Sequence, residues 1–341
     1  MEHYKPHPGS VFEGYYHKFR LPSGAHLALI ICTVPKATEK PPHMVSFTYV
    51  PHDPTKIFQK EVWVKELEMI PTKPDHSFEH RIPGMGYVKC GPDSTTEYSL
   101  DCEHFSFHGK TTSRTPWSDE TETPEGLLVN LPLPLHWHVQ SLSSDVSFTM
   151  KIPSYPNLPA SDRQGIATVH QEKNWANSFP SAHIWIQARD HDTRSGITIA
   201  GGQILGLEAY LLGFRARDPK YNTDFRPPFA TALPFVGGPT MAAKPDWGNR
   251  TFELSVQSWR RKVVVKAEAP KGTFFSLSSP FPDGHRENFL GESFRATVRV
   301  QVFEAGWWGA WVLKHEEVFE GASLEFGGGY YPPAGSEERW H

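Results

Sequence analysis

The densest group of chemically active side chains lies in residues 170–187. An imidazole, a carboxylate, an ammonium and an amide follow one another there as His170, Glu172, Lys173 and Asn174. Alternate residues of an extended strand point to the same face, so His170 and Glu172 share one face while Lys173 lies on the other. Hydrogen-bond donors beside apolar walls suit a pocket for an apolar ligand that carries oxygen functions.

Aromatic and amide side chains continue this group. Trp175 follows Asn174 directly, and Trp185 and Gln187 share one face of the next expected strand. A purely structural interpretation explains the same residues, with Glu172 and Lys173 as an ion pair at a turn and Trp175 in the core. The pattern alone leaves both interpretations open.

Short runs in which apolar and polar residues alternate recur along the whole chain. In residues 296–302 the apolar side chains all fall on one face, and residues 251–257 repeat the pattern. Clusters of Pro, Gly, Asp and Ser separate these runs, which is typical of strands joined by turns. The sequence therefore predicts an all-β antiparallel sandwich or barrel with few short helices and long loops, such as 111–126 and 218–248.

Domain organisation is less sharply marked. The segment 152–165 is rich in Pro, Ser and Asp. We expect one unit over residues 1–341, with the alternative of two β-rich halves, 1–151 and 166–341, joined by this segment.

Composition excludes several classes of protein. Lys and Arg total 34 against 38 Asp and Glu, so the net charge of −4 offers no basic field for nucleic acid. The longest strongly apolar run, near residues 27–34, is too short to span a bilayer. The three cysteines are few and widely spread, and the first residues do not resemble a signal peptide. We therefore expect a cytoplasmic protein that does not span the membrane.

The sequence gives little support for a metal or a cofactor. His136 and His138 share one side of an expected strand, at a spacing that a metal pair can use, but no third ligand is identifiable. Cys102, His104 and His108 share what we expect to be an exposed face. Dinucleotide, phosphate-loop and nucleophile-elbow patterns are missing from the sequence. We predict neither a metal site nor a bound cofactor.

The strongest aromatic cluster lies near the end of the chain, at Trp307, Trp308 and Trp311. Such a cluster either forms the wall of a hydrocarbon pocket or closes one end of a barrel. The two roles are compatible, and we include these tryptophans among the expected substrate-binding residues.

Three segments resemble one known family in order and spacing. Residues 172–175 (Glu-Lys-Asn-Trp), followed by 179–180 (Phe-Pro) and 185–187 (Trp-Ile-Gln), closely resemble the signature of tocopherol cyclases. Residues 12–18 (Phe-Glu-Gly-Tyr-Tyr-His-Lys) resemble that family's opening motif, and residues 324–330 (Leu-Glu-Phe-Gly-Gly-Gly-Tyr) resemble its closing one. Together these segments bracket almost the whole chain.

The resemblance implies a lipocalin-like β-barrel without a metal and a pocket for a prenylated aromatic or polyene substrate. It places Glu13 and Tyr15 of the opening motif at the substrate. In this family an oxygen heterocycle is closed, and similar proteins of fungal secondary metabolism act as hetero-Diels–Alderases that join a quinone methide to a terpene alkene.

Several positions depart from the family pattern, and they favour the hetero-Diels–Alderase branch. Tyr15 replaces a tryptophan, Ala176 replaces a glycine, and His183 and Ile184 stand where the family has aromatic residues. The scaffold tolerates these changes, but the lining of the pocket is altered. We therefore predict a cofactor-independent pericyclase acting on terpenoid and quinoid substrates.

For a cycloaddition we expect Lys173 and His170 to donate hydrogen bonds to the quinone-methide carbonyl, with Glu172 positioning Lys173 and with Asn174 and Gln187 as further donors. Proton-initiated chroman closure is an alternative, which needs a strong carboxylic acid such as Glu172, Glu13 or Glu325. A lipocalin-like carrier that binds a terpenoid without transforming it is the third hypothesis.

Overall fold

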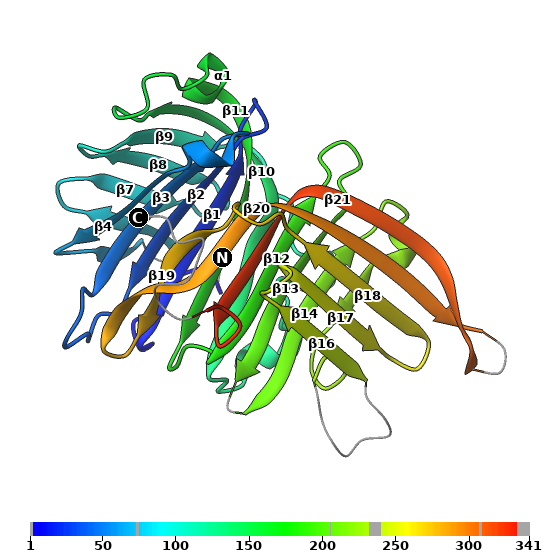
Figure 1. Cartoon of the computed structure of the whole chain (residues 1–341). Helices are drawn as coiled ribbons and strands as arrows, with labels where there is room; N and C mark the ends of the chain where they lie inside the picture. Colours follow the sequence, from blue (N-terminus) through cyan, green and yellow to red (C-terminus); the bar gives the residue numbers. More distant parts are fainter. Residues whose placement is uncertain (1–2, 73–74, 205, 232–239, 307–308, 333–341) are drawn as a thin grey trace. The chain divides into compact units, whose positions relative to one another are not determined.

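The structure is a computed structural model that describes residues 3–72, 75–204, 206–231, 240–306 and 309–332 (Figure 1). The chain forms two compact units. Unit 1 comprises the residues up to 179 together with 280–286, and unit 2 comprises 180–279 and the residues from 287 onward. The segment 152–165, which joins the two halves in the alternative that we considered, lies within unit 1.

Unit 1 is built on one antiparallel sheet with the strand order β4-β3-β2-β1-β11-β10-β9-β8-β7-β6-β5. The strands are β1 (Phe12–Arg20), β2 (His26–Thr33), β3 (His43–Val50), β4 (Phe58–Val64), β5 (Glu68–Thr72), β6 (Ser77–Ile82), β7 (Gly86–Cys90), β8 (Thr96–Asp101), β9 (Ser106–Thr111), β10 (Leu135–Lys151) and β11 (Gln164–Ala176).

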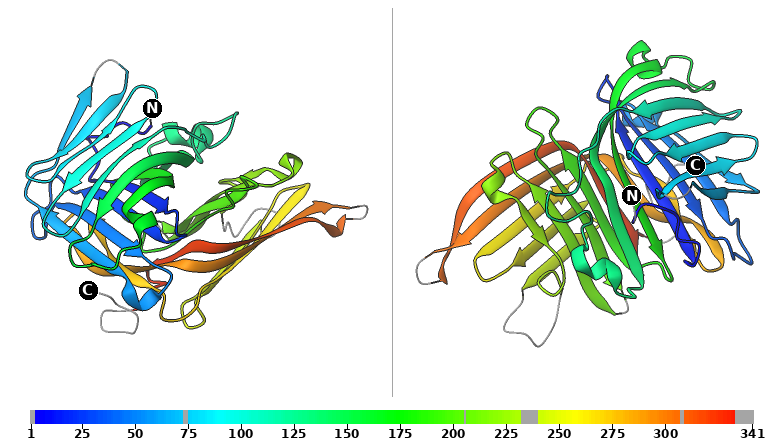
Figure 2. Two further views of the ribbon diagram at one scale, coloured as in Figure 1. Left: turned by 90° about the horizontal axis from the view of Figure 1, so that it is seen from above. Right: turned by 180° about the vertical axis from the view of Figure 1, so that it is seen from behind.

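The sheet of unit 1 curls around a large apolar core (Figure 2). Phe47 of β3 stacks on Phe105, which precedes β9, with ring centroids 4.1 Å apart. Because these residues are far apart in the strand order, their contact shows that the sheet bends back on itself. Strands β1 and β11 are buried on both faces, so their polar residues must find partners inside the protein.

Unit 2 contains a second antiparallel sheet, with the order β15-β14-β13-β12-β21-β20-β18-β17-β16 and with β19 paired to β20. The strands are β12 (Ala182–Arg189), β13 (Gly196–Ile204), β14 (Leu207–Arg215), β15 (Thr223–Phe225), β16 (Met241–Asp246), β17 (Thr251–Gln257), β18 (Arg261–Glu268), β19 (Phe275–Phe281), β20 (Gly284–Ala305) and β21 (Trp311–Gly328). Its core draws apolar side chains from most of these strands.

Helices in the described residues are short, as the sequence predicts. They are α1 (Ala160–Arg163) and three 3-10 turns, η1 (Pro54–Lys56), η2 (Gly126–Asn130) and η3 (Pro219–Tyr221). None of them is long and apolar enough to cross a membrane. The predicted all-β fold is confirmed, with lipocalin-like architecture.

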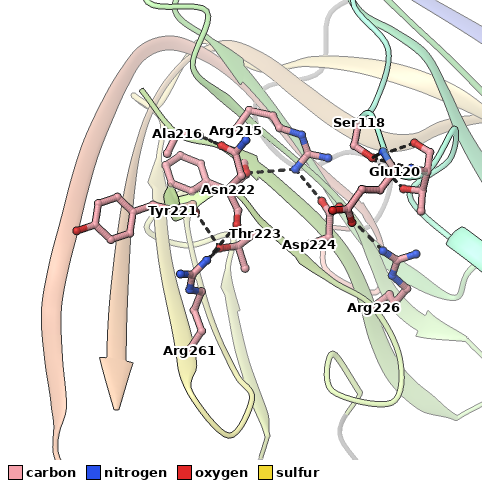
Figure 3. Close-up of polar contacts among 12 residues, drawn as sticks. Ser118, Glu120, Arg215, Ala216, Tyr221, Asn222, Thr223, Asp224, Arg226 and Arg261 are labelled. Atoms are coloured by element: carbon pink, nitrogen blue, oxygen red, sulfur yellow. Dashed lines mark hydrogen bonds and ion pairs between the residues drawn. The ribbon is translucent and has the colours of Figure 1, made fainter. Parts of the chain in front are cut away.

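The described parts of 218–248, which we expected to be a loop, contain η3, β15 and β16. Figure 3 shows how side chains hold its first part. Arg215 Nη1 lies 2.8 Å from the Asp224 carboxylate. Arg261 donates to the carbonyl of Asn222 at 3.1 Å. Such long-range contacts are not visible as local periodicity.

Candidate functional site

Two of the sequence motifs pair with each other in unit 1. Strand β1 runs antiparallel to β11, with Gly14 opposite Asn174 and Tyr15 opposite Lys173. The segments 12–18 and 172–175 therefore lie side by side although about 160 residues separate them. Hydrogen-bonded register is what places the side chains of the two motifs within reach of each other.

An ion pair between Lys173 and Glu13 joins these two strands. Both side chains are buried, with relative exposures of 0% for Lys173 and 3% for Glu13. The Lys173 ammonium also donates to the backbone carbonyls of Tyr4, at 3.4 Å, and of Lys5. Its fourth contact is with His7 Nδ1 at 2.7 Å. The ammonium thus binds the segment that precedes β1 as well as Glu13.

His7 links the ion pair to the surface. Its backbone N–H donates to Glu13 Oε1 at 2.8 Å, and its ring lies 3.3 Å from the same oxygen. The shorter contact with Lys173 makes Nδ1 the acceptor, so we assign the ring proton to Nε2. The imidazole therefore keeps one N–H donor for another partner.

The charges of this group are set by burial and by proximity. Burial lowers the pKa of Lys173 to about 8, against the opposing effect of the Glu13 carboxylate. Burial raises the pKa of Glu13, but the His7 hydrogen bond and the charge of Lys173 outweigh it, so the net pKa is lowered. Burial also lowers the pKa of His7. At neutral pH the group is an ammonium, a carboxylate and a neutral imidazole.

Trp175 lies between two imidazoles. The ring of His7 stacks on it with centroids 4.1 Å apart and planes inclined by 2°, and His136 stacks at 4.9 Å and 16°. The Lys173 ammonium is 5.1 Å from the centroid of Trp175 and 4.8 Å from that of Tyr15. These cation–π contacts favour the charged form of the amine.

A pocket of about 460 Å³ opens beside this stack. Its volume is in the range of small-molecule sites. The lining combines apolar and polar groups: Lys5, Pro6, His7, Pro8, Gly9, Ser10, Pro132, Leu133, His136, Trp175, Ala176 and Asn177. His7, which keeps one N–H donor, therefore lines a largely apolar pocket.

His170 and Glu172 lie on the opposite face of β11 from Lys173. His170 Nε2 contacts Glu172 Oε2 at 2.9 Å, and both residues are buried. The carboxylate that holds Lys173 is Glu13, so the expectation that Glu172 positions Lys173 is wrong. The cause is strand alternation, which sends the neighbouring side chains 172 and 173 to different faces.

Asn174 shares this second face. Its Oδ1 lies 2.9 Å from the place that a Cβ would take at Gly14. The glycine of the opening motif therefore leaves room for the amide of the other motif. Asn174 does not share the face of Lys173 and Trp175.

The remaining predicted site residues belong to unit 2. Trp185 and Gln187 are buried in β12, which pairs with the closing motif so that Trp185 faces Glu325. His183 Nε2 lies 2.7 Å from Glu325 Oε1. Trp311 begins β21 and is partly exposed. Trp307 and Trp308 lie outside the described residues.

The histidines that we weighed as a metal pair have other partners. His136 Nδ1 lies 2.9 Å from Glu125 Oε2, and His138 Nε2 lies 3.2 Å from Gln140 Oε1. Among the described residues no group of three potential ligands is placed to hold a metal ion.

Sequence reasoning missed Tyr4 and His7. Both lie in a stretch without periodicity, where no strand or helix pattern marks them. A concentration of aromatic, histidine and proline residues just before the opening motif is the signal that was present. His136 was noticed, but as a metal ligand and not as part of a stack on Trp175.

The fold and this site define an all-β protein of lipocalin-like architecture with a buried ammonium–carboxylate pair beside a small-molecule pocket. No protein-family profile matches the chain, and no curated protein matches it in sequence. Two solved structures share the fold. One is kievitone hydratase from Nectria haematococca, with a TM-score of 0.51, 8% identity, and coverage of 95% of this chain and 91% of that one.

The other is a candidate AttH protein of Nitrosomonas europaea, with a TM-score of 0.50 and 11% identity. That match covers 97% of this chain and 96% of the other. At these identities the likeness concerns the fold.

Proposed function

We propose that this protein is a cofactor-independent cyclase of the pericyclase type, which forms a dihydropyran ring. Its substrates are a quinone methide and a terpene alkene, and the reaction is a hetero-Diels–Alder cycloaddition. The observation that carries the proposal is the neutral His7, which is held by the buried Lys173 and lines a largely apolar pocket. The resemblance to tocopherol cyclases and the fold shared with a hydratase support it.

The geometry suits this reaction because a cycloaddition needs alignment more than proton transfer. Holding two partners in a near-attack arrangement supplies up to about 7–11 kcal/mol of the barrier. The edge of Trp175 and the neighbouring prolines offer apolar surface for the alkene chain. A hydrogen bond from His7 to the carbonyl of the quinone methide stabilises the negative charge that develops on oxygen.

Lys173 acts on this donor through His7. Its ammonium donates to Nδ1 at 2.7 Å and so fixes the tautomer that carries the proton on Nε2. It also polarises the ring, which makes Nε2–H a stronger donor. Glu13 in turn holds Lys173 and the backbone of His7. In this proposal Lys173 and Glu13 are positioning residues and His7 is the catalytic residue.

Proton-initiated chroman closure fits the site less well. It requires a carboxylic acid that stays protonated until it meets the alkene. The pKa of Glu13 is lowered, so this group is ionised at neutral pH. Glu172 and Glu325 each contact an imidazole nitrogen, at 2.9 and 2.7 Å. These pairings favour cycloaddition over protonation.

The test is chiral chromatography with mass detection on a quinone-methide precursor mixed with a polyene terpene. The wild-type protein should give a faster, single-enantiomer adduct with chelator present. His7→Phe, which keeps an aromatic ring over Trp175, should reduce the rate about 10²–10³-fold. Lys173→Met should lower it as well, with a loss of the pH dependence that Lys173 causes.

Four outcomes contradict the proposal. An unchanged racemic adduct would exclude catalysis of this reaction, and saturable terpenoid binding without turnover would identify a carrier. Solvent deuterium in a product formed from a prenyl hydroquinone would identify proton-initiated closure. Full activity in His7→Phe would refute the assigned catalytic residue.

A further inference from the structure

We propose that the interior of unit 1 contains a binding site for a hydroxylated aromatic ring, and that the side chain of Tyr4 occupies it in this structure. A ligand of that class takes the place of Tyr4 when residues 3–6 move out, while His7 keeps its stack on Trp175 and its contact with Lys173. The inference deepens the proposed function and rests on it for the quinoid nature of the natural ligand. The site itself follows from the contacts of Tyr4.

Tyr4 is enclosed as a bound ligand would be. Its side chain has 0% exposure although it lies near the start of the chain. Its ring centroid is 5.3 Å from that of Tyr15, at 74°, and 5.7 Å from that of Phe78. The ring of His138 lies 6.1 Å away, and the hydroxyl group lies 2.9 Å from His17 Nε2. These contacts recognise a planar ring by its faces and a phenol by its oxygen.

Residues 3–6 are held by the enclosed Tyr4 ring and by a few hydrogen bonds to main-chain carbonyls. The segment forms turns and no strand before Phe12. Lys173 binds the carbonyls of Tyr4 and Lys5, and the Tyr15 hydroxyl donates to the Tyr4 carbonyl at 3.1 Å. His7 has separate contacts, because its N–H donates to Glu13. A ligand that fills the place of the Tyr4 ring therefore releases residues 3–6 and leaves His7 in place.

Buried imidazole atoms near Tyr4 have unused hydrogen-bonding capacity. Both ring nitrogens of His80, together with Nδ1 of His17 and Nδ1 of His138, have no partner among the described residues. The three side chains are about 1% exposed. Buried polar atoms are normally paired, so an environment with these atoms suits an occupant with more oxygen functions than the single hydroxyl of tyrosine.

These imidazoles are uncharged. Burial lowers the pKa of His17, His80 and His138 to about 3 in each case. A neutral imidazole donates one hydrogen bond and accepts one, which matches a phenol next to a carbonyl. The structure therefore points to a hydroxyaryl ligand with a second oxygen substituent, the class from which a quinone methide is made.

The experiment titrates the full chain with p-cresol, which has the ring and hydroxyl of the tyrosine side chain, and with toluene, which lacks the hydroxyl. Binding is measured by calorimetry, and hydrogen exchange follows the amides of residues 3–6. We expect the wild-type protein to bind p-cresol saturably and at least tenfold more tightly than toluene. The bound state should show faster exchange in residues 3–6.

Two variants test whether p-cresol binds at the position of the Tyr4 side chain. In Tyr4→Gly the competing side chain is gone, so affinity for p-cresol should rise about tenfold or more. Tyr155→Gly removes an aromatic ring elsewhere in unit 1 and should leave that affinity unchanged. Equal affinity in wild type and Tyr4→Gly, or protection of residues 3–6 in the bound state, would overturn the inference.

These experiments distinguish a failure of this inference from a failure of the proposed function. Adduct formation without p-cresol binding at Tyr4 would remove this inference and leave the cyclase intact. Binding of p-cresol with release of the segment, but with no adduct from any quinone-methide precursor, would remove the proposed cyclase and leave the site.

Discussion

The ion pair between Glu13 and Lys173 can be tested by a double-mutant cycle with Glu13→Gln and Lys173→Met. Both side chains are nearly inaccessible, with exposures of 3% and 0%. Removing one member of a buried pair leaves an uncompensated charge, which typically costs about 3–5 kcal/mol. Independent effects would therefore sum to about 6–10 kcal/mol for the double variant.

The double variant leaves no buried charge at this position. Its remaining cost is the hydrogen bonds that Lys173 makes to the carbonyls of Tyr4 and Lys5, about 1–3 kcal/mol in all. We therefore expect a coupling free energy of at least about 3 kcal/mol. Urea unfolding at pH 7, followed by circular dichroism and tryptophan fluorescence, measures it where the two transitions coincide.

The dependence of stability on pH gives a second test of the same ion pair. In Lys173→Met the charge and hydrogen bond of Lys173 no longer lower the pKa of Glu13, so this pKa should be higher in the folded variant than in the folded wild type. The folded variant then binds the proton more tightly than wild type does, so the difference in stability between the two should grow as pH rises through this range. The loss relative to wild type should therefore be smaller at pH 4.5 than at pH 7. Free energies that add within about 0.5 kcal/mol, with no dependence on pH, would refute the reasoning.

Three further predictions concern single positions. In Gly327→Ala the new Cβ would lie 1.9 Å from a ring atom of His183. We therefore expect urea unfolding to show a free energy of unfolding lower by about 2 kcal/mol or more. The control Gly9→Ala has no atom within 4 Å of the new Cβ and should change that free energy by less than about 0.5 kcal/mol. Because the pKa of Lys173 is about 8, adduct formation should decline as the pH rises past about 8 and the ammonium loses its charge, and Lys173→Met should lack this limb of the pH–rate profile. Trp175→Ala removes the surface on which His7 stacks. Calorimetry should therefore show terpenoid binding weakened about tenfold or more, which corresponds to about 1.4 kcal/mol of binding free energy for each factor of ten. Unchanged affinity would place the ligand elsewhere.

The class of fold could be predicted from the amino-acid sequence alone. Period-two alternation in segments such as 251–257 and 296–302 predicts strands, and both are strands in the structure. Alternation depends on neighbouring residues and on which face is buried, so it can be read without tertiary information. The same rule correctly separated the face of His170 and Glu172 from that of Lys173.

The partners of the site residues were decided by the tertiary structure. Glu13 and Lys173 meet because β1 pairs with β11 in one particular register, and a shift of one residue would have sent the side chains of one strand to the other face. Tyr4 and His7 reach the site through turns that carry no periodic pattern. The alternation of apolar and polar residues within a strand is local, so it can be recognised in the sequence. The choice of the strand that pairs with it depends on the free energy of the whole packed sheet.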